Sequence, residues 1–219
     1  MRKYILILVA CALAATSCNL DDQFSATNVT DLVTVYSNTM LINDYNTSYT
    51  ITTDETDHLW QKGDRLMILF DIHNRDYEIT LKDYAKCVIC VPENISGEEP
   101  VLGTDPVLID ACTITGGYVN CEITYYFKKG SNAAHLIDMV YMDDGTNLHL
   151  YISHNGNEEN PSKMNKNNLD TVTVPYSFQI AGLVPSGESR RLSLTMNILN
   201  ENNEVEAKTY SLLSEPVRF

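Results

Sequence analysis

Cysteine is the residue type whose spacing in this chain comes closest to a chemical motif. Cys87 and Cys90 lie three positions apart in "CVIC", the spacing used by redox-active dithiols and by zinc sites. Val88 and Ile89 favour a β-strand, in which three steps would separate the two cysteines by about 10 Å on opposite faces. A disulfide requires Cα atoms within about 7 Å of each other. We therefore predict that Cys87 and Cys90 are buried structural thiols.

A second pair, Cys112 and Cys121, can meet across a hairpin. If the Gly-Gly pair at 116–117 forms a two-residue loop, Cys112 lies opposite Cys121 in a non-hydrogen-bonded pair, with Cα atoms about 4.5 Å apart. The same register places Asp110 beside Ile123 on the face expected to be buried, and a bulge or a longer loop would move the register. These two cysteines are the candidate disulfide, and the sequence leaves its formation open.

Carboxylates and histidines give weaker signals. Asp143 and Asp144 could bind calcium, but "DDGT" is more simply a hairpin turn in which Gly145 takes a positive φ. The histidines show no ligand spacing, since His149 and His154 would lie on opposite faces of one strand. We also find no nucleophile elbow, phosphate loop or zinc-protease motif. We therefore expect no catalytic activity, no cofactor and no metal site.

Aromatic side chains could instead form a binding face. Trp60, Tyr77 and Tyr84 could line a surface of the kind through which OB-like barrels bind sugars or nucleic acid. Packing in a hydrophobic core is the simpler explanation for the single Trp. A polysaccharide would be compatible with the charge of the chain, but no residue requires one.

The amino terminus predicts export and lipidation. Arg2 and Lys3 precede an apolar run at residues 4–15, which is too short to cross a hydrocarbon core of about 30 Å and is typical of a secretory signal peptide. The following "ATSC" resembles a bacterial lipobox, whose cysteine, here Cys18, carries fatty acyl chains such as palmitate. We predict a signal peptide at 1–17 and a membrane anchor on Cys18. The alternative is an ordinary secreted protein with a free thiol at this position.

The residues that follow Cys18 bear on localisation. Asn19, Asp21 and Asp22 resemble the acidic signal that sends some bacterial lipoproteins to the outer surface, although a solvated tether would have the same composition. We expect a lipidated tether at 18–30 and an outer-membrane lipoprotein exposed at the cell surface.

Composition narrows the classes of partner and fold. Without residues 1–17, which carry two basic and no acidic residues, the chain keeps 13 basic and 29 acidic residues, a net charge of −16. Such acidity disfavours nucleic acid, because phosphates are bound by Lys and Arg. The 13 Tyr, with many Val, Ile and Thr, favour strands over helices.

The spacing of strand-like runs predicts two β domains. The Pro-, Gly- and Glu-rich segment 92–106 is the best boundary. Five runs precede it and suit a small barrel, and seven follow it and suit a sandwich. We predict an all-β protein with an OB-like barrel at 31–97, a linker at 98–106 and an immunoglobulin-like β-sandwich at 107–219. The predicted strands are 32–37, 48–54, 64–73, 77–81 and 85–91, then 107–115, 118–127, 134–142, 147–154, 171–180, 191–199 and 207–213.

Several of these stretches together resemble the NigD-like lipoproteins. The resemblance rests on the lipobox, "HLWQKGDRLMILFDI", "DPVLIDACTITGGYVNCEITYYF", and "AHLIDMVYMDDGTNLHLYISHN" with "VPYSFQIAGLVP". It implies an OB-like domain followed by a β-sandwich and a function that is not established. The four cysteines after the lipobox are a departure from the family pattern.

The resemblance leaves two functional hypotheses. The first is a non-catalytic lipoprotein that binds or scaffolds a surface ligand, either a glycan or a protein. The second, implied by the bacteriocin gene cluster that gives the family its name, is an accessory or self-protection protein of a bacteriocin system. "DTV" at 170–172 further resembles a short sequon for O-glycans on exported proteins, which makes Thr171 a candidate modification site.

Overall fold

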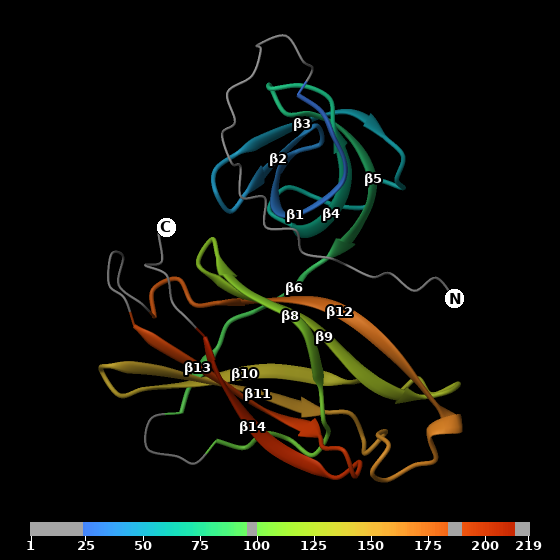
Figure 1. Ribbon diagram of the computed structural model, residues 1–219, viewed down its shortest axis with the longest axis vertical. Helices are drawn as coiled ribbons and strands as arrows, with labels where there is room; N and C mark the ends of the chain where they lie inside the picture. Colours follow the sequence, from blue (N-terminus) through green and yellow to red (C-terminus); the bar gives the residue numbers. More distant parts are fainter. Residues whose placement is uncertain (1–23, 96–99, 184–189, 213–219) are drawn as a thin grey trace. The chain divides into compact units, whose positions relative to one another are not determined.

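The computed structural model describes residues 24–95, 100–183 and 190–212 (Figure 1). These residues form two compact units that divide between Ala85 and Lys86. Cys18, the predicted lipid anchor, and residues 1–23 around it lie outside the described residues. Within the described ranges, the structure contains no helix of the length and apolarity that a membrane crossing requires.

The first unit is a closed five-stranded barrel, seen nearly end-on in Figure 1. The strand order is β1-β2-β3-β5-β4, as expected for an OB-like barrel. Side chains along β4 alternate between the two faces of the strand, so that Leu66, Ile68, Phe70 and Ile72 point into the core of the barrel. The strands are β1 (Ala26–Ser37), β2 (Met40–Asn43), β3 (Ser48–Asp54), β4 (Arg65–Ile72) and β5 (Glu78–Lys86).

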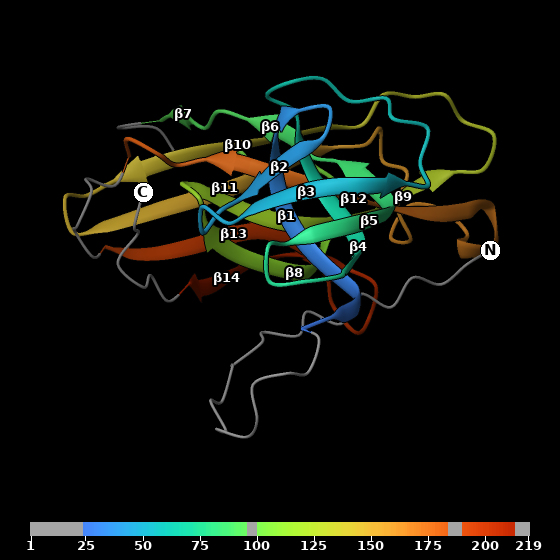
Figure 2. The same ribbon diagram turned by 90° about the horizontal axis from the view of Figure 1, so that it is seen from above.

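The second unit is a β-sandwich, and its two sheets are visible as facing layers in Figure 1. One sheet has the order β14-β13-β11-β10-β7, which Figure 2 shows across its width, and the other has the order β6-β12-β9-β8. Apolar side chains from both sheets form a single core. The elements are β6 (Val88–Cys90), β7 (Glu93–Asn94), β8 (Leu108–Thr115), β9 (Tyr118–Lys128), β10 (Leu136–Asp143), β11 (Asn147–Asn155), the short 3-10 helix η1 (Lys166–Asn168), β12 (Leu169–Gln179), β13 (Arg191–Leu199) and β14 (Val205–Leu212).

The all-β prediction with a barrel and a sandwich is confirmed, and all seven predicted sandwich strands are present. Two strands in and next to the barrel differ from those predicted. It contains β2, which the sequence did not predict. The predicted strand at 85–91 is divided, because β5 ends at Lys86 and β6 pairs with β12 of the sandwich.

The limits of the units also differ from those predicted. The boundary lies at Ala85 and Lys86 instead of at 98–106, because β6 and β7 add parallel edge strands to the two sandwich sheets. At the other end, β1 begins at Ala26, within the segment 18–30 that was expected to be a tether. Hydrogen bonding to β4 orders this polar stretch despite its low hydrophobicity.

Candidate functional site

The hairpin β8–β9 places the candidate disulfide residues opposite each other. Cys112 pairs with Cys121 across the two-glycine turn, as the register predicted. Their Sγ atoms are 3.4 Å apart as thiols. The difficulty at Asp110 is removed by a bulge, because Ile109 pairs with Ile123 and the aspartate is left out of the register. The disulfide itself stays a prediction.

The structure confirms a strand only over Val88–Cys90 of "CVIC", since Cys87 lies between β5 and β6, and the burial of both cysteines is only partial. β6 runs parallel to β12, and Cys87 and Cys90 are both half-buried. The Cys90 thiol lies 3.9 Å from the carbonyl oxygen of Ile137, and burial raises its pKa. A raised pKa keeps this thiol protonated, which suits a structural side chain better than a redox centre.

The three candidate aromatic residues do not form one binding face. Trp60 is buried in the barrel core, where its ring packs against Tyr84 with centroids 4.8 Å apart and against His58 at 4.0 Å. Tyr77 packs elsewhere, against Tyr49 at 5.8 Å. Core packing, the simpler explanation for Trp60, is therefore confirmed.

The remaining sequence candidates have local roles or accessible positions. Gly145 has a φ of 85° and its N–H donates to Asp143, so "DDGT" is a turn. Hydrogen bonds led by the side chain of Asn147 hold the pKa of Asp144 well below its usual range. Thr171 is exposed on β12, and its glycosylation stays a prediction.

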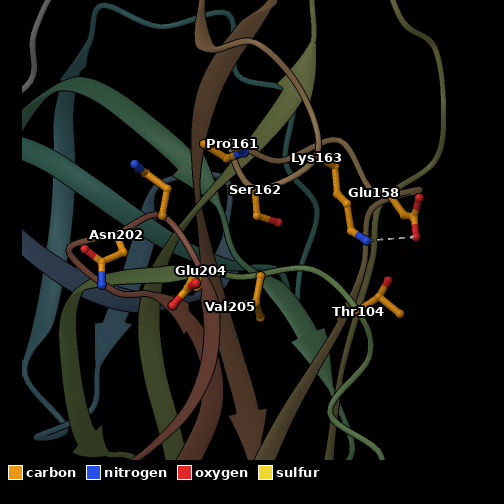
Figure 3. Close-up of a pocket in the computed structure, with 9 residues that line it drawn as sticks. Thr104, Glu158, Pro161, Ser162, Lys163, Asn202, Glu204 and Val205 are labelled. Carbon is orange, nitrogen blue, oxygen red and sulfur yellow. Dashed lines mark ion pairs between the residues drawn. The ribbon is translucent and has the colours of Figure 1, made fainter.

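Sequence reasoning missed a polar recess in the sandwich, with a volume of about 720 Å³ (Figure 3). Its walls are Thr104, the loop residues 158 and 161–163, and residues 202–205 at the turn between β13 and β14. Figure 3 shows Lys163 extending toward Glu158, with which it forms a long ion pair of 4.0 Å. We use the name recess for the space between these walls.

Asp105 holds the loop that forms one wall of the recess. Its carboxylate is only 1 % exposed and accepts hydrogen bonds from the N–H groups of Gly156 and Glu158, at 2.9 and 3.2 Å. The amide of Asn160 and the hydroxyl of Thr104 also donate to it, at 2.6 and 2.9 Å. Burial alone would raise the pKa of Asp105, but these donors hold it below its ordinary value. The loop is therefore organised around a buried anion.

The segment that carries Asp105 is itself fixed to β11. The N–H of Asp105 donates to the carbonyl oxygen of His154, whose own N–H donates to Leu102, both at 3.2 Å. Gly103 lies between these contacts with a φ of 73°, and a Cβ at this position would lie 2.2 Å from the His154 oxygen. Only glycine therefore allows the segment to approach β11 this closely.

Glu159 provides a second attachment for the same loop. Its carboxylate accepts hydrogen bonds from the backbone N–H of Lys128 and from the hydroxyl of Ser131, both at 2.7 Å. The Nε2 atom of His135 lies 3.4 Å from the same carboxylate. The hydrogen bond from Lys128, more than the other contacts, holds the pKa of Glu159 below its ordinary value.

Two histidines meet beside this loop, although the sequence showed no ligand spacing among them. His135 Nδ1 and His154 Nε2 are 3.2 Å apart, and the ring of Tyr125 stacks on His135 with centroids 4.8 Å apart. The register of the β10–β11 hairpin, in which Ile137 faces His154, was the signal that could have brought the two residues together. His149 and His154 lie on opposite faces of β11, as predicted, and His149 is the less buried of the two.

The chemistry of the recess suits a polar ligand. Its lining offers hydrogen-bond donors and acceptors, one ammonium group and two carboxylates, from Thr104, Ser162, Asn202, Asn203, Lys163, Glu158 and Glu204. Such groups can recognise hydroxyl, amide and charged groups through hydrogen bonds. Within the described ranges, no three His, Cys, Asp or Glu residues gather as a metal site would require.

Comparison with protein families gives a match that covers most of the β-sandwich. Residues 90–212 match the model of the NigD-like C-terminal beta sandwich domain. A protein of unknown function from Bacteroides vulgatus has a similar structure, with 17% identity, a TM-score of 0.64, and coverage of 88% of this chain and 92% of its own. A comparison with curated protein sequences gives no significant match.

Two further solved structures have informative names. A NigD-like immunity protein from Bacteroides caccae is 13% identical with a TM-score of 0.64, over 87% of this chain and 99% of its own. A protein from Bacteroides fragilis named as a putative lipoprotein is 14% identical with a TM-score of 0.62, over the same shares of the two chains. At such low identity the structural similarity establishes the fold alone.

Proposed function

The chain belongs to the NigD-like family, and we propose that it is a non-catalytic lipoprotein of the outer membrane that binds a polar surface ligand in the recess of its β-sandwich. The ligand is a glycan or an exposed segment of a protein. The lipobox that ends at Cys18 supports the anchor, and the lipoprotein name of the Bacteroides fragilis structure is consistent with it.

The main observation behind the binding proposal is that buried carboxylates hold the loop that forms one wall of the recess. Asp105 is 1 % exposed and Glu159 is 7 % exposed, and each holds the loop through two or more hydrogen bonds. Burying a carboxylate is costly unless it is well hydrogen-bonded. A polar surface loop held in this way is already ordered before a ligand arrives, which reduces the entropy lost on binding.

Reversing a charge in the recess is expected to weaken ligand binding about tenfold or more, or about 1.4 kcal/mol. Lys163→Glu and Glu204→Lys are suitable changes, because both side chains are exposed and make only long polar contacts within the protein. The measurement is retention of polysaccharide, and separately of outer-membrane proteins, extracted from the producing cells by the immobilised full chain.

The control is Glu55→Lys on the exposed surface of the barrel, which changes the charge by the same amount as Glu204→Lys and in the same direction. If the recess variants and the control lost equal amounts of ligand binding, the binding site would lie outside the recess. Binding of neither class of material by the unchanged protein would reject the proposed ligand.

A second prediction concerns the anchor. Cys18→Ala removes the thiol that acylation requires, so the protein is expected to move from the membrane fraction to the soluble fraction. Fractionation and the intact mass of the amino-terminal peptide measure this change, with Cys11→Ala in the signal segment as the matched control. A variant that stayed in the membrane fraction would show that the anchor lies elsewhere.

Self-protection against a bacteriocin is a second candidate function. It is favoured by one observation, the name of the NigD-like immunity protein from Bacteroides caccae, whose fold this chain shares. The same retention experiment separates the two candidates when spent culture medium replaces the envelope extracts. Retention of a secreted antibacterial peptide, lost in the recess variants, would favour this second candidate.

A further inference from the structure

The histidine pair beside the recess wall is enclosed between two groups that can only accept hydrogen bonds. His154 Nδ1 lies 3.3 Å from the carbonyl oxygen of Pro106, and His135 Nε2 lies 3.4 Å from the carboxylate of Glu159. The other two ring nitrogens face each other at 3.2 Å. Both side chains are buried, with His154 only 2 % exposed. The pair therefore depends on its own protons to satisfy the contact with Pro106 and the contact between the rings.

Counting protons gives the charge of this arrangement. His154 Nδ1 donates an N–H to Pro106 and one proton lies between the facing nitrogens, so these two contacts use two protons. His135 Nε2 makes no hydrogen bond among the described residues, and the Glu159 carboxylate at 3.4 Å is its ion-pair partner when it carries a proton. Two neutral imidazoles hold only two protons. A third proton, on His135 Nε2, gives the pair one positive charge, which the carboxylate of Glu159 balances at close range.

We propose that His135, His154 and Glu159 form a proton-sensitive latch, in which a fourth proton separates the two rings and releases the loop 156–163. A fourth proton would place two N–H groups against each other across 3.2 Å and a second charge in a buried site. Its consequence for ligand binding rests on the proposed function of the recess, since this loop forms one of the walls.

The packing around the rings directs the movement to the loop. A Cβ at Gly156 would lie 2.7 Å from His135 Nδ1 and 2.9 Å from His154 Nε2, so the loop backbone passes directly over the facing nitrogens. On the opposite side, Tyr125 of β9 contacts both rings, with centroids at 4.8 and 5.3 Å. The strand is held by its sheet, whereas the loop is held by the hydrogen bonds of Asp105 and Glu159 and by one from Asn157 to the carbonyl oxygen of Ala134.

The titratable groups that face the pair are Tyr125 from β9, Asp105 from the segment before β8 and Glu159 from the loop. Burial raises the pKa of Tyr125, so its hydroxyl stays neutral and adds no charge. Burial lowers the pKa of His154, which resists the fourth proton in the folded protein. An unfolded chain accepts that proton more readily, so stability is expected to fall as the pH decreases below about 6.5.

The test is a histidine titration by NMR of the full chain in detergent, without any ligand. The unchanged protein is expected to show two buried imidazoles that titrate together, distinct from the exposed His73. Glu159→Gln removes the balancing charge and should move the titration of the pair to lower pH by about 1 unit or more. Glu158→Gln is the matched control, because this neighbouring side chain is exposed and faces the recess.

Hydrogen exchange in the same samples measures release of the loop. After correction for the intrinsic pH dependence, the amides of Glu159, Lys163 and Met164, which are hydrogen-bonded within the loop, should lose protection at least tenfold between pH 7 and pH 5. The amides of Asn203 and Glu204, on the opposite wall, donate to the carbonyl and side-chain oxygens of Asn200 and should keep their protection.

Independent titration of the two histidines, or equal titrations for Glu159→Gln and Glu158→Gln, would overturn the latch. Unchanged loop protection at pH 5 would overturn it even if the recess binds its ligand. Failure of ligand retention in the separate binding experiment would reject the proposed function and leave the latch standing.

Discussion

Replacing Asp105 with alanine is expected to lower the free energy of unfolding of the sandwich by about 3 kcal/mol. The change removes a buried acceptor that receives four hydrogen bonds, from Thr104, Gly156, Glu158 and Asn160. Each donor loses its partner, and the two in the loop backbone lie next to the recess. Ligand binding in the recess should therefore fall together with stability.

Urea unfolding followed by circular dichroism measures this effect. Asp110→Ala is the matched control, because this exposed aspartate in the same unit accepts a single side-chain hydrogen bond, from Thr124, and should change stability by about 0.5 kcal/mol or less. Asp105→Asn keeps the size but replaces an acceptor by a donor, so it should recover little of the loss. Full recovery by asparagine would show that the buried charge is not required.

The pH dependence of this contribution follows from the lowered pKa of Asp105. The unfolded chain binds the proton at the ordinary value of 3.8, whereas the folded protein binds it only at lower pH. The stabilisation is therefore complete above the ordinary pKa and is lost as the pH falls through the folded pKa. The difference in stability between the unchanged protein and Asp105→Asn should shrink in the same range.

Oxidation of Cys112 and Cys121 to a disulfide is expected to raise the free energy of unfolding by about 2 to 3 kcal/mol, through the loop that it closes in the unfolded chain. The hydrogen bond from Cys121 lowers the pKa of Cys112 and makes it the thiol that ionises first. An envelope thiol oxidoreductase with a reactive disulfide would accept the two electrons and be reduced to its dithiol, while both cysteines lose their protons.

Peptide mapping of protein isolated from the native envelope identifies the bridge, and unfolding with and without a reductant measures its effect. Cys112→Ser should abolish the response to the reductant, whereas Cys87→Ser should leave it unchanged. A bridge between Cys87 and Cys90 would contradict the prediction that these two cysteines are structural thiols. Four free thiols would show that the pair stays reduced in its native compartment.

The amino-acid sequence by itself determined those features that depend on neighbouring residues. The spacing of strand-like runs located the seven main strands of the sandwich, and the Gly-Gly turn set the pairing of Cys112 with Cys121. The pairing of the two cysteines is a local feature because a tight turn leaves few registers open to the strands that it joins. Core packing was also the simpler explanation for the single Trp, and Trp60 lies in the barrel core.

The boundary between the two units could be located only from the tertiary structure. The segment at 92–106 has the composition of a linker, yet it contains β7, and β6 lies just before it. Both strands are short, and their pairing partners are β10 and β12, far along the chain. Parallel pairing of such short edge strands depends on sheets that have already formed, and composition carries no sign of it.

The recess and its histidine pair were also decided only by the fold. Asp105 receives hydrogen bonds from residues 51 to 55 positions away, and His135 meets His154 across a hairpin and Glu159 across a loop. Buried carboxylates and imidazoles look the same in sequence as exposed ones. Their roles arise because three segments distant in the chain converge at one end of β11, where each polar group finds its partner away from water.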